Sequence, residues 1–212
     1  FDVEQRNDAI RDADIVVSML PANLHLLLAE DCVIQGVNMI TASYISKEIK
    51  ALNEKAEEKG VLLLNEMGLD PGLDHLSAKK IIDEIQAKGG EITLFKSFCG
   101  GLVAPKYDDN PWNYKFTWNP RNVVLAGKGT AQFIRNNQPK FIAYNKLFKR
   151  TELIEVLDEG HFEGYANRDS LSYREIYGLE NIPTMFRGTL RRPGFSEAWD
   201  VFVRMGMTDD SF

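Results

Sequence analysis

The segment Val61-Leu62-Leu63-Leu64 is an unbroken apolar run that leads into Asn-Glu-Met-Gly-Leu-Asp-Pro-Gly-Leu-Asp-His at residues 65–75. The run is typical of a buried strand, and the glycines and proline predict a sharp turn before a helix that begins at Asp74. Two earlier runs, at 15–20 and 38–42, also end in turn or polar residues. Three such strand ends can line one crevice, which is where open α/β sheets bind ligands. Alternatively, these residues only form turns.

The first 70 residues alternate strands with helices. We expect strands at 15–20, 38–42 and 61–64, separated by helices at 23–35 and 46–59. Ser46 is a predicted helix cap, and the buried side of its helix carries Ile49, Leu52 and Ala56. Repeated βα units predict a parallel sheet whose strands are buried on both faces.

The pattern changes after Pro71-Gly72. A long helix is predicted at 74–88, with four apolar residues facing inward: Leu76, Ile81, Ile82 and Ile85. Closely spaced strands then predict a mixed or antiparallel sheet, with a final helix at 195–205. The expected strands span residues 91–100, 123–125, 140–144, 162–165 and 184–191. The chain is therefore predicted to be α/β, with one domain at 1–72 and a second, α+β domain at 73–212.

Composition excludes several classes of function. The 212-residue chain has a net charge of -6, which argues against broad nucleic-acid binding because that needs a basic face. No stretch approaches the roughly 20 apolar residues of a membrane helix, and the polar amino terminus does not resemble a signal peptide. Two cysteines make no disulfide framework, so we expect a cytoplasmic protein. The three histidines lack ligand spacing, so no metal site is predicted.

Arginines gather in the second half of the chain. Arg187, Thr189 and Arg191 share one side of a predicted strand, and Arg168 lies in Asn-Arg-Asp-Ser at 167–170. Guanidinium groups on one sheet face of an acidic protein suggest bidentate binding of carboxylates. The alternative is a solvated edge strand guarded by charge.

Cys99-Gly100-Gly101 follows the first strand of the second domain. The two glycines would let the backbone approach a ligand closely. The alternative is a simple turn beside a buried cysteine, and no motif supplies Cys99 with a base.

Several motifs together resemble the NADP-dependent, glutamate-forming saccharopine dehydrogenases, also called saccharopine reductases. The resemblance spans nearly the whole chain in order and spacing. The segments that carry it are Ser43-Tyr44-Ile45-Ser46, residues 65–76, Cys99-Gly100-Gly101, Asn110-Pro111, Tyr114-Lys115-Phe116, Asn167-Arg168-Asp169-Ser170 and residues 187–191.

The resemblance implies a domain organisation. Residues 1–72 correspond to the second half of a Rossmann-like NADP-binding domain, and 73–212 to most of a mixed-sheet domain that binds saccharopine and dimerises. The chain contains no G-x-G-x-x-G, and neither the family's pyrophosphate loop nor its helical domain has a counterpart here. We therefore expect a fragment that is inactive alone, from a parent that is an enzyme and a homodimer.

The resemblance also implies residue roles. The implied substrate-binding residues are Ser43, Tyr44, Asp70, Arg168, Thr189, Leu190 and Arg191. The implied cofactor-binding residues are Ser18, Leu69, Asp70, Pro71 and Trp118. Orienting roles in catalysis fall to Asp70, Tyr44 and Cys99. At the rim, Arg192-Pro193 departs from the family's commoner Tyr-Gln.

The implied reaction belongs to lysine metabolism and acts on a small amino-acid substrate. Glutamate and 2-aminoadipate 6-semialdehyde condense to an imine, which NADPH reduces by hydride transfer to saccharopine. Two alternatives stay open. One is a related oxidoreductase of the carboxynorspermidine type, and the other is a non-catalytic dimerisation or binding module.

Overall fold

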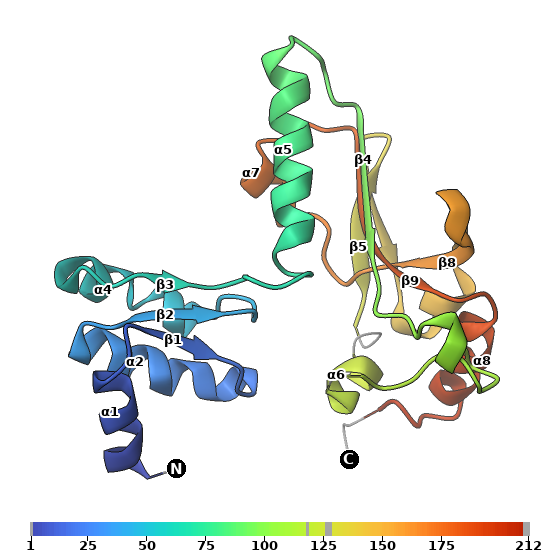
Figure 1. Cartoon of the computed structure of the whole chain (residues 1–212). Coiled ribbons are helices and arrows are strands. Elements are labelled where there is room, and N and C mark those ends of the chain that lie inside the picture. Colours follow the sequence, from blue (N-terminus) through green and yellow to red (C-terminus); the bar gives the residue numbers. More distant parts are fainter. Residues whose placement is uncertain (1, 118, 126–128, 210–212) are drawn as a thin grey trace. The chain divides into compact units, whose positions relative to one another are not determined.

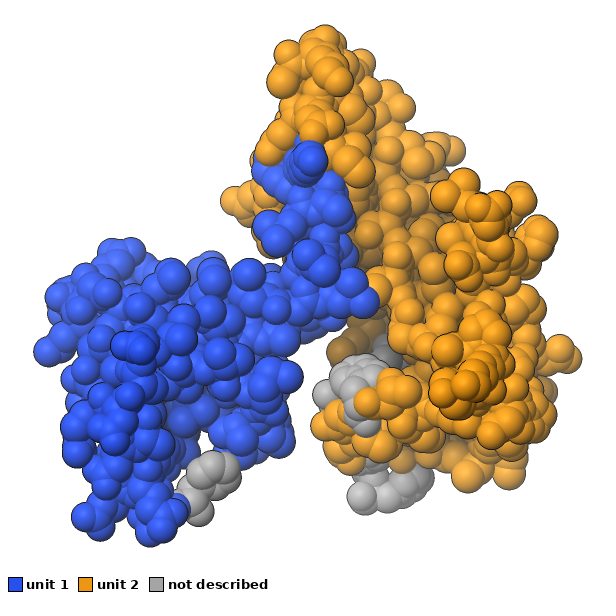
Figure 2. All heavy atoms as spheres, viewed as in Figure 1, with its two compact units in different colours: residues 1–80 blue, residues 81–212 orange. Residues whose placement is uncertain are grey.

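The computed structural model describes residues 2–117, 119–125 and 129–209. The chain divides into two compact units, residues 1–80 and 81–212, which Figure 1 shows as ribbons and Figure 2 in two colours. Helix α5 (Leu73–Ala87) crosses this division in sequence. Among the described residues, no helix is both long and apolar enough to cross a membrane.

Unit 1 is built on a parallel sheet of the order β1-β2-β3. The strands are β1 (Ile15–Ser18), β2 (Asn38–Thr41) and β3 (Leu63–Leu64). The register pairs Ser18 with Thr41 and Ile40 with Leu64, so the carboxyl ends of the strands lie at one edge. The predicted alternation of strands and helices is confirmed, although each strand is shorter than its apolar run.

Five helical segments accompany these strands, one before β1 and four in the connections between strands. They are α1 (Val3–Arg11), η1 (Ala22–Leu24), α2 (His25–Gln35), α3 (Lys47–Lys50) and α4 (Asn53–Lys59). Helix α2 packs on the sheet (Figure 1), and its Ala29 and Cys32 lie in one cluster with Met39 of β2. Burial raises the pKa of the Cys32 thiol to about 11, so this cysteine is a core residue.

The predicted single helix at 46–59 is instead two helices. Ser46 caps α3 by accepting a hydrogen bond from the backbone N–H of Ile49, as expected. The chain then turns at Ala51 and Leu52 before α4 begins. Ile49, Leu52 and Ala56 are nevertheless buried, because the turn keeps the apolar side of both helices on the core.

The prediction that these strands are buried on both faces is wrong for the described chain. Ile15 and Val17 of β1 are 44% and 60% exposed, and Leu62 beside β3 is 56% exposed. These side chains lie on the opposite face from Ser18, whose face is covered by α2.

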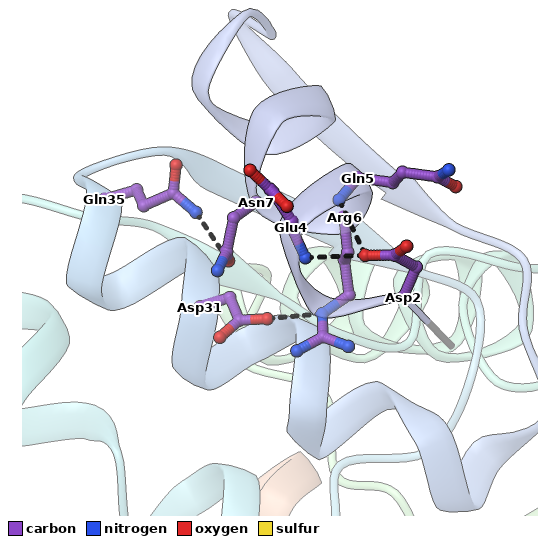
Figure 3. Close-up of polar contacts among 7 residues, drawn as sticks. All are labelled: Asp2, Glu4, Gln5, Arg6, Asn7, Asp31 and Gln35. Carbon is purple, nitrogen blue, oxygen red and sulfur yellow. Dashed lines mark hydrogen bonds and ion pairs between the residues drawn. The ribbon is translucent and has the colours of Figure 1, made fainter.

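Helices α1 and α2 are joined by polar contacts (Figure 3). Arg6 Nε lies 2.6 Å from Asp31 Oδ2, and Gln35 donates a hydrogen bond of 3.1 Å to Asn7. Asp2 caps α1 by accepting hydrogen bonds from the next turn. The Arg6 and Asp31 side chains are only 11% and 16% exposed. Removal of either one would therefore leave the other charge largely buried without its partner.

Helix α5 confirms the predicted helix but not its buried side. Of the four residues expected to face inward, only Ile82 is buried. Leu76, Ile81 and Ile85 are 59%, 57% and 39% exposed. The spacing of apolar residues predicted the helix correctly, but it did not show which of these residues would pack against the rest of the protein.

Unit 2 contains a six-stranded mixed sheet. Its strands are β4 (Leu94–Cys99), β5 (Ala131–Arg135), β6 (Gln138–Ile142), β7 (Glu152–Val156), β8 (Gly160–Ala166) and β9 (Thr184–Arg191). Its remaining helical segments are η2 (Pro105–Tyr107), α6 (Pro120–Leu125), η3 (Tyr144–Lys149), η4 (Leu157–Glu159), α7 (Tyr173–Tyr177) and α8 (Phe195–Arg204).

Strand β9 is the centre of this sheet. It pairs with β4 in parallel and with β5 and β8 antiparallel, in the order β6-β5-β9-β8-β7. Thr189 lies between Cys99 of β4 and Tyr165 of β8. The predicted mixed sheet is therefore confirmed, and its central strand carries Arg187, Thr189, Leu190 and Arg191.

An aromatic core covers the sheet. Phe186 of β9 packs against Phe98 and Phe133, with ring centroids 5.5 and 5.0 Å apart. Phe195 and Trp199 of α8 stack at 5.2 Å in the same cluster. The strand expected at 123–125 is instead part of α6, where Val123 is buried in this core. Strands β5 and β7 were not predicted.

We expect the Arg6→Ala variant to lose about 1 to 3 kcal/mol of local stability, because it leaves the largely buried Asp31 carboxylate without its partner. Hydrogen exchange at the α2 amides measures this loss. Arg11→Ala is the matched control, because Arg11 and Asp8 on the same helix are 66% and 57% exposed. Its loss should stay below about 0.5 kcal/mol. Equal losses in both variants would contradict the interpretation.

Candidate functional site

The strand ends of unit 1 meet at a buried histidine. His25 is the first residue of α2 and is 1% exposed. Its Nδ1 lies 2.8 Å from Ser18 Oγ, and its Nε2 lies 2.8 Å from Ser43 Oγ and 3.2 Å from Thr41 Oγ1. The sheet register places Ser18 beside Thr41, so both hydroxyls face the start of α2. His25 thereby connects the ends of β1 and β2.

Burial lowers the pKa of His25 below its ordinary value of 6.5. The imidazole is therefore neutral at pH 7. In a neutral imidazole one ring nitrogen donates a hydrogen bond and the other accepts one, so Nδ1 and Nε2 of His25 have opposite roles.

Backbone hydrogen bonds join the segments that follow β2 and β3. The N–H of Met67 donates to Thr41 O at 3.1 Å, and the N–H of Glu66 donates to Ser43 O at 3.0 Å. The Glu66 carboxylate also accepts a hydrogen bond from the N–H of Ile45. Glu66 has a φ of 60°, which is costly for a residue with a side chain. These bonds fix the loop that carries Ser43 and Tyr44.

The loop at 68–74 folds tightly on itself. The N–H of Gly68 donates to Pro71 O, and the N–H of Leu73 donates back to Gly68 O, both at 2.9 Å. Gly72 has a φ of 147°, and a Cβ there would lie 2.1 Å from Gly68 O. Only glycine fits at position 72, which explains why the motif has a glycine directly after Pro71.

This loop places Asp70 beside Tyr44. The Tyr44 hydroxyl donates a hydrogen bond of 2.8 Å to Asp70 Oδ1. Tyr44 is 51% exposed and Asp70 is partly exposed, so both can reach a ligand. The structure therefore brings together two residues that the sequence places 26 positions apart.

The residues of unit 1 that are expected to bind the cofactor lie around the same strand ends. Ser18 ends β1 and is buried against His25, whereas Leu69 is 63% exposed. Pro71 is buried and follows a cis peptide bond. Trp118 lies outside the described residues.

In unit 2, Thr189 and Cys99 are neighbours in the sheet. The Thr189 hydroxyl donates a hydrogen bond of 2.7 Å to Asn167 Oδ1. Gly100 does not leave room for a ligand as expected, because a Cβ there would lie 2.2 Å from Leu190 O. The glycine instead allows the backbone at Gly100 to lie close to the backbone at Leu190.

Arg187 and Arg191 are buried in the central strand, so the alternative of a charged edge strand is wrong. The guanidinium of Arg187 lies 4.0 Å from the ring centroid of Tyr173. Arg191 lies over three aromatic rings and donates through Nη1 to Leu190 O. Those rings belong to Tyr114, Tyr165 and Phe195.

One nitrogen of Arg191 has unused hydrogen-bonding capacity. Its Nε is buried and has no hydrogen-bond partner among the described residues. The nearby Tyr165 has a raised pKa because burial disfavours its charged form, although Arg191 and Thr189 act against this shift. Tyr165 therefore stays protonated.

Arg168 lies on the turn that follows β8, and backbone hydrogen bonds connect this turn to β5 and β9. Its carbonyl accepts from the N–H of Gln132, and the N–H of Asn167 donates to Arg187 O. The Arg168 side chain is exposed, and its guanidinium has no hydrogen bond or ion pair within the described part of the chain.

Asp169 holds this turn in place. Its Oδ1 accepts from the backbone N–H groups of Leu171 and Ser172 and from Gln132 Nε2. Burial alone would raise the pKa of Asp169, but these hydrogen bonds together lower it. Asp169 is therefore an ionised cap that fixes the backbone on which Arg168 stands.

Two other features of the described residues lie apart from these sites. A pocket of about 360 Å³ in unit 2 is lined by Phe148, Glu163, Asp200 and neighbours, none of which the sequence singled out. No cluster of His, Cys, Asp and Glu that could hold a metal ion occurs in the described part.

Sequence reasoning missed His25, Glu66 and Asn167. His25 had a usable signal, because a polar residue in the first helical turn after a strand faces the strand ends. Glu66 had none, since a positive φ at glutamate has no sequence signature. Asn167 entered the sequence analysis only as part of the Asn-Arg-Asp-Ser motif, although its Oδ1 accepts a hydrogen bond from the Thr189 hydroxyl.

We expect the free energy of unfolding to fall as the pH drops below 6.5. The unfolded chain then binds a proton at His25 that the folded state, with its lower pKa, does not bind. Urea unfolding at a series of pH values measures the slope. The His25→Gln variant should show a smaller slope over the same range. An identical slope in the two proteins would contradict the burial of a neutral His25.

Comparisons with known proteins bear on the identity of both units. Residues 1–64 match the family model of the saccharopine dehydrogenase NADP binding domain, and residues 68–212 match that of the saccharopine dehydrogenase C-terminal domain. The chain is 40% identical to bovine (Bos taurus) mitochondrial alpha-aminoadipic semialdehyde synthase, over 99% of this chain and 23% of that protein.

It is also 37% identical to the saccharopine dehydrogenase [NADP(+), L-glutamate-forming] of Pyricularia oryzae, over 98% of this chain and 47% of that protein. The structure resembles apo saccharopine dehydrogenase (L-Glu forming) from Saccharomyces cerevisiae with a TM-score of 0.90 and 34% identity. That match covers 100% of this chain and 48% of the yeast chain. The chain thus spans about half the length of the fungal relatives, and it belongs to the saccharopine dehydrogenase family.

Proposed function

We propose that the complete protein carrying this chain is an NADP-dependent, glutamate-forming saccharopine dehydrogenase. The observation that carries the proposal is the Tyr44–Asp70 hydrogen bond at the carboxyl ends of parallel strands, in a chain of this family. Because Tyr44 donates to Asp70, its oxygen offers lone pairs to a ligand. Lone pairs suit the amine of saccharopine or an attacking water.

The proposed reaction removes two electrons from saccharopine as a hydride and then breaks one of its carbon–nitrogen bonds. The carbon beside the secondary amine loses a hydride and the nitrogen loses a proton, which leaves an imine. Water adds to the imine carbon, and the carbon–nitrogen bond then breaks to give glutamate and 2-aminoadipate 6-semialdehyde. Bound NADP+ would accept the hydride. In this scheme Asp70, Tyr44 and Cys99 orient the reacting groups.

The cofactor site is proposed for the strand ends of unit 1. Leu69 is an exposed apolar side chain directly before Asp70, which fits a flat, partly apolar nicotinamide ring. Ser18 and Pro71 complete the described part of this site, and Trp118 is proposed from the resemblance alone.

The substrate residues are proposed separately in each unit. Unit 1 supplies Ser43, Tyr44 and Asp70. Unit 2 supplies Arg168 and the run Thr189-Leu190-Arg191. Saccharopine carries three carboxylates, and the exposed guanidinium of Arg168, which has no partner among the described residues, suits one of them.

Assay of the complete protein tests the proposal. We expect saccharopine-dependent reduction of NADP+, with glutamate as a product. Turnover of carboxynorspermidine in place of saccharopine would favour the related polyamine enzyme. Absence of turnover with either substrate would favour a non-catalytic module and contradict the proposal.

Substitution of Arg168 tests the carboxylate role. A partly desolvated charged pair costs about 2 to 5 kcal/mol when truncated. Arg168→Ala in the complete protein should therefore raise the saccharopine KM about 30-fold or more, at about tenfold per 1.4 kcal/mol. The NADPH KM should hardly change. Arg150→Ala removes the same charge from another exposed position and should leave both constants unchanged. An unchanged saccharopine KM in Arg168→Ala would contradict the assignment.

We also propose a homodimer formed through unit 2. Supporting this, Trp112 and Phe116 near α8 are 39% and 49% exposed, although Tyr114 between them is core. Light scattering of the complete protein at tens of micromolar should give twice the chain mass, and a monomeric mass would contradict the proposal. We further infer a cytoplasmic location, because Cys32 and Cys99 form no disulfide within the described part of the chain.

A further inference from the structure

The hydroxyl groups around His25 form a connected network with limited hydrogen-bonding capacity. Ser18 and Thr41 are 3% and 1% exposed, whereas Ser43 is partly exposed. Within the described part of the chain, His25 is the partner of the Ser18 side chain. Thr41 Oγ1 meets His25 Nε2 and also accepts from the N–H of Ser43.

The neutral imidazole allows two arrangements of protons. With the proton on Nε2, Ser18 donates to Nδ1, and Nε2–H donates to Ser43. With the proton on Nδ1, His25 donates to Ser18, and Nε2 accepts from Ser43 or Thr41. The hydrogen-bond direction through Ser18, His25 and Ser43 is reversed between the two tautomers.

The two tautomers differ in how many buried hydroxyls lack an acceptor among the described residues. The Nε2–H form leaves only the proton of Thr41 unused, because Nε2 no longer accepts. The Nδ1–H form leaves the proton of Ser18 unused, and when Ser43 donates to the single Nε2 lone pair, Thr41 lacks an acceptor as well. An unsatisfied buried donor is costly, so the network favours the Nε2–H form.

Ser43 is the member of the network that can meet a ligand. In the Nε2–H form its oxygen accepts from His25, and its own proton is free to donate to a ligand acceptor. In the Nδ1–H form Ser43 either donates to Nε2 and presents only lone pairs outward, or faces a nitrogen already occupied by the Thr41 proton at 2.8 Å. The Nε2–H form is therefore the arrangement that suits a ligand carboxylate.

We propose that His25 is a positioning residue for Ser43, and that its Nε2–H tautomer leaves the Ser43 proton free to donate to a ligand carboxylate. The inference rests on the proposed function, since the substrate supplies the carboxylate. His25 touches no substrate atom. It acts through Ser43, and Ser18 completes the arrangement by donating to Nδ1.

Nitrogen-15 NMR of the imidazole ring in the complete protein tests the tautomer directly. In the unsubstituted protein with saccharopine and NADP+, the Nε2 resonance of His25 should be that of a protonated ring nitrogen and the Nδ1 resonance that of an unprotonated one. In Ser43→Ala the Nε2–H group loses its acceptor and Thr41 can donate to Nε2, so the proton should move to Nδ1. A protonated Nδ1 in the unsubstituted protein, or the same tautomer in both proteins, would contradict the proposal.

A double-mutant cycle tests the positioning role. Ser43→Ala and His25→Phe should each raise the saccharopine KM about tenfold, which corresponds to about 1.4 kcal/mol. Because His25 acts through Ser43, the double variant should lose at most about twofold more than either single variant. The NADPH KM should stay within about twofold in all three variants. Where His25→Phe fails to fold, His25→Gln takes its place, because glutamine keeps hydrogen-bonding groups at this buried position.

The outcomes separate this inference from the proposed function. The rise in saccharopine KM in the double variant could equal the product of the two single rises, or a folded His25 variant could show an unchanged saccharopine KM. Either result would mean that His25 only stabilises the fold. If the unsubstituted protein oxidises saccharopine and the variants give either of these results, this inference is contradicted and the proposed function is not. Failure of the unsubstituted protein to oxidise saccharopine would contradict the proposed function and this inference together.

Discussion

The site in unit 1 depends on hydrogen bonds that continue past the ends of β2 and β3. The N–H groups of Glu66 and Met67 reach the carbonyls of Ser43 and Thr41, although β3 itself is only two residues long. Without this extension, the loops carrying Tyr44 and Asp70 would have no fixed relation to each other. The His25 network adds a second connection, from β1 to β2, on the face covered by α2. Two sets of polar contacts thus position one polar edge of the sheet.

Unit 2 depends in a similar way on its central strand. Strand β9 hydrogen-bonds β4 on one side and β5 and β8 on the other, so its arginines lie inside the sheet. The guanidinium of Arg187 lies over one aromatic ring and that of Arg191 over three, and these rings stabilise both charges. Arg168 differs, because its backbone is fixed while its guanidinium is exposed. This contrast explains why Arg168 is the clearest candidate for binding an anion from outside.

The sequence predicted those features that depend on local patterns. Apolar runs located β1 and β2, the Ser46 cap located α3, and motifs located the loop containing Asp70. Features that depend on tertiary contacts were harder to predict. Residues 123–125 read as a strand because Val123 and its neighbours are apolar, but that segment follows Pro120 as a helix packed on the core. The buried side of α5 and the part played by His25 likewise depend on which elements meet, which periodicity does not encode.

The central claim is that the strand ends of unit 1 form the ligand site. Hydrogen–deuterium exchange of the complete protein, with and without saccharopine and NADP+ together, tests this claim most directly. The account predicts slower exchange at residues 41–46 and 66–72 when the ligands are bound, with α4 unchanged as an internal reference. Slower exchange confined to segments outside these two loops would contradict it.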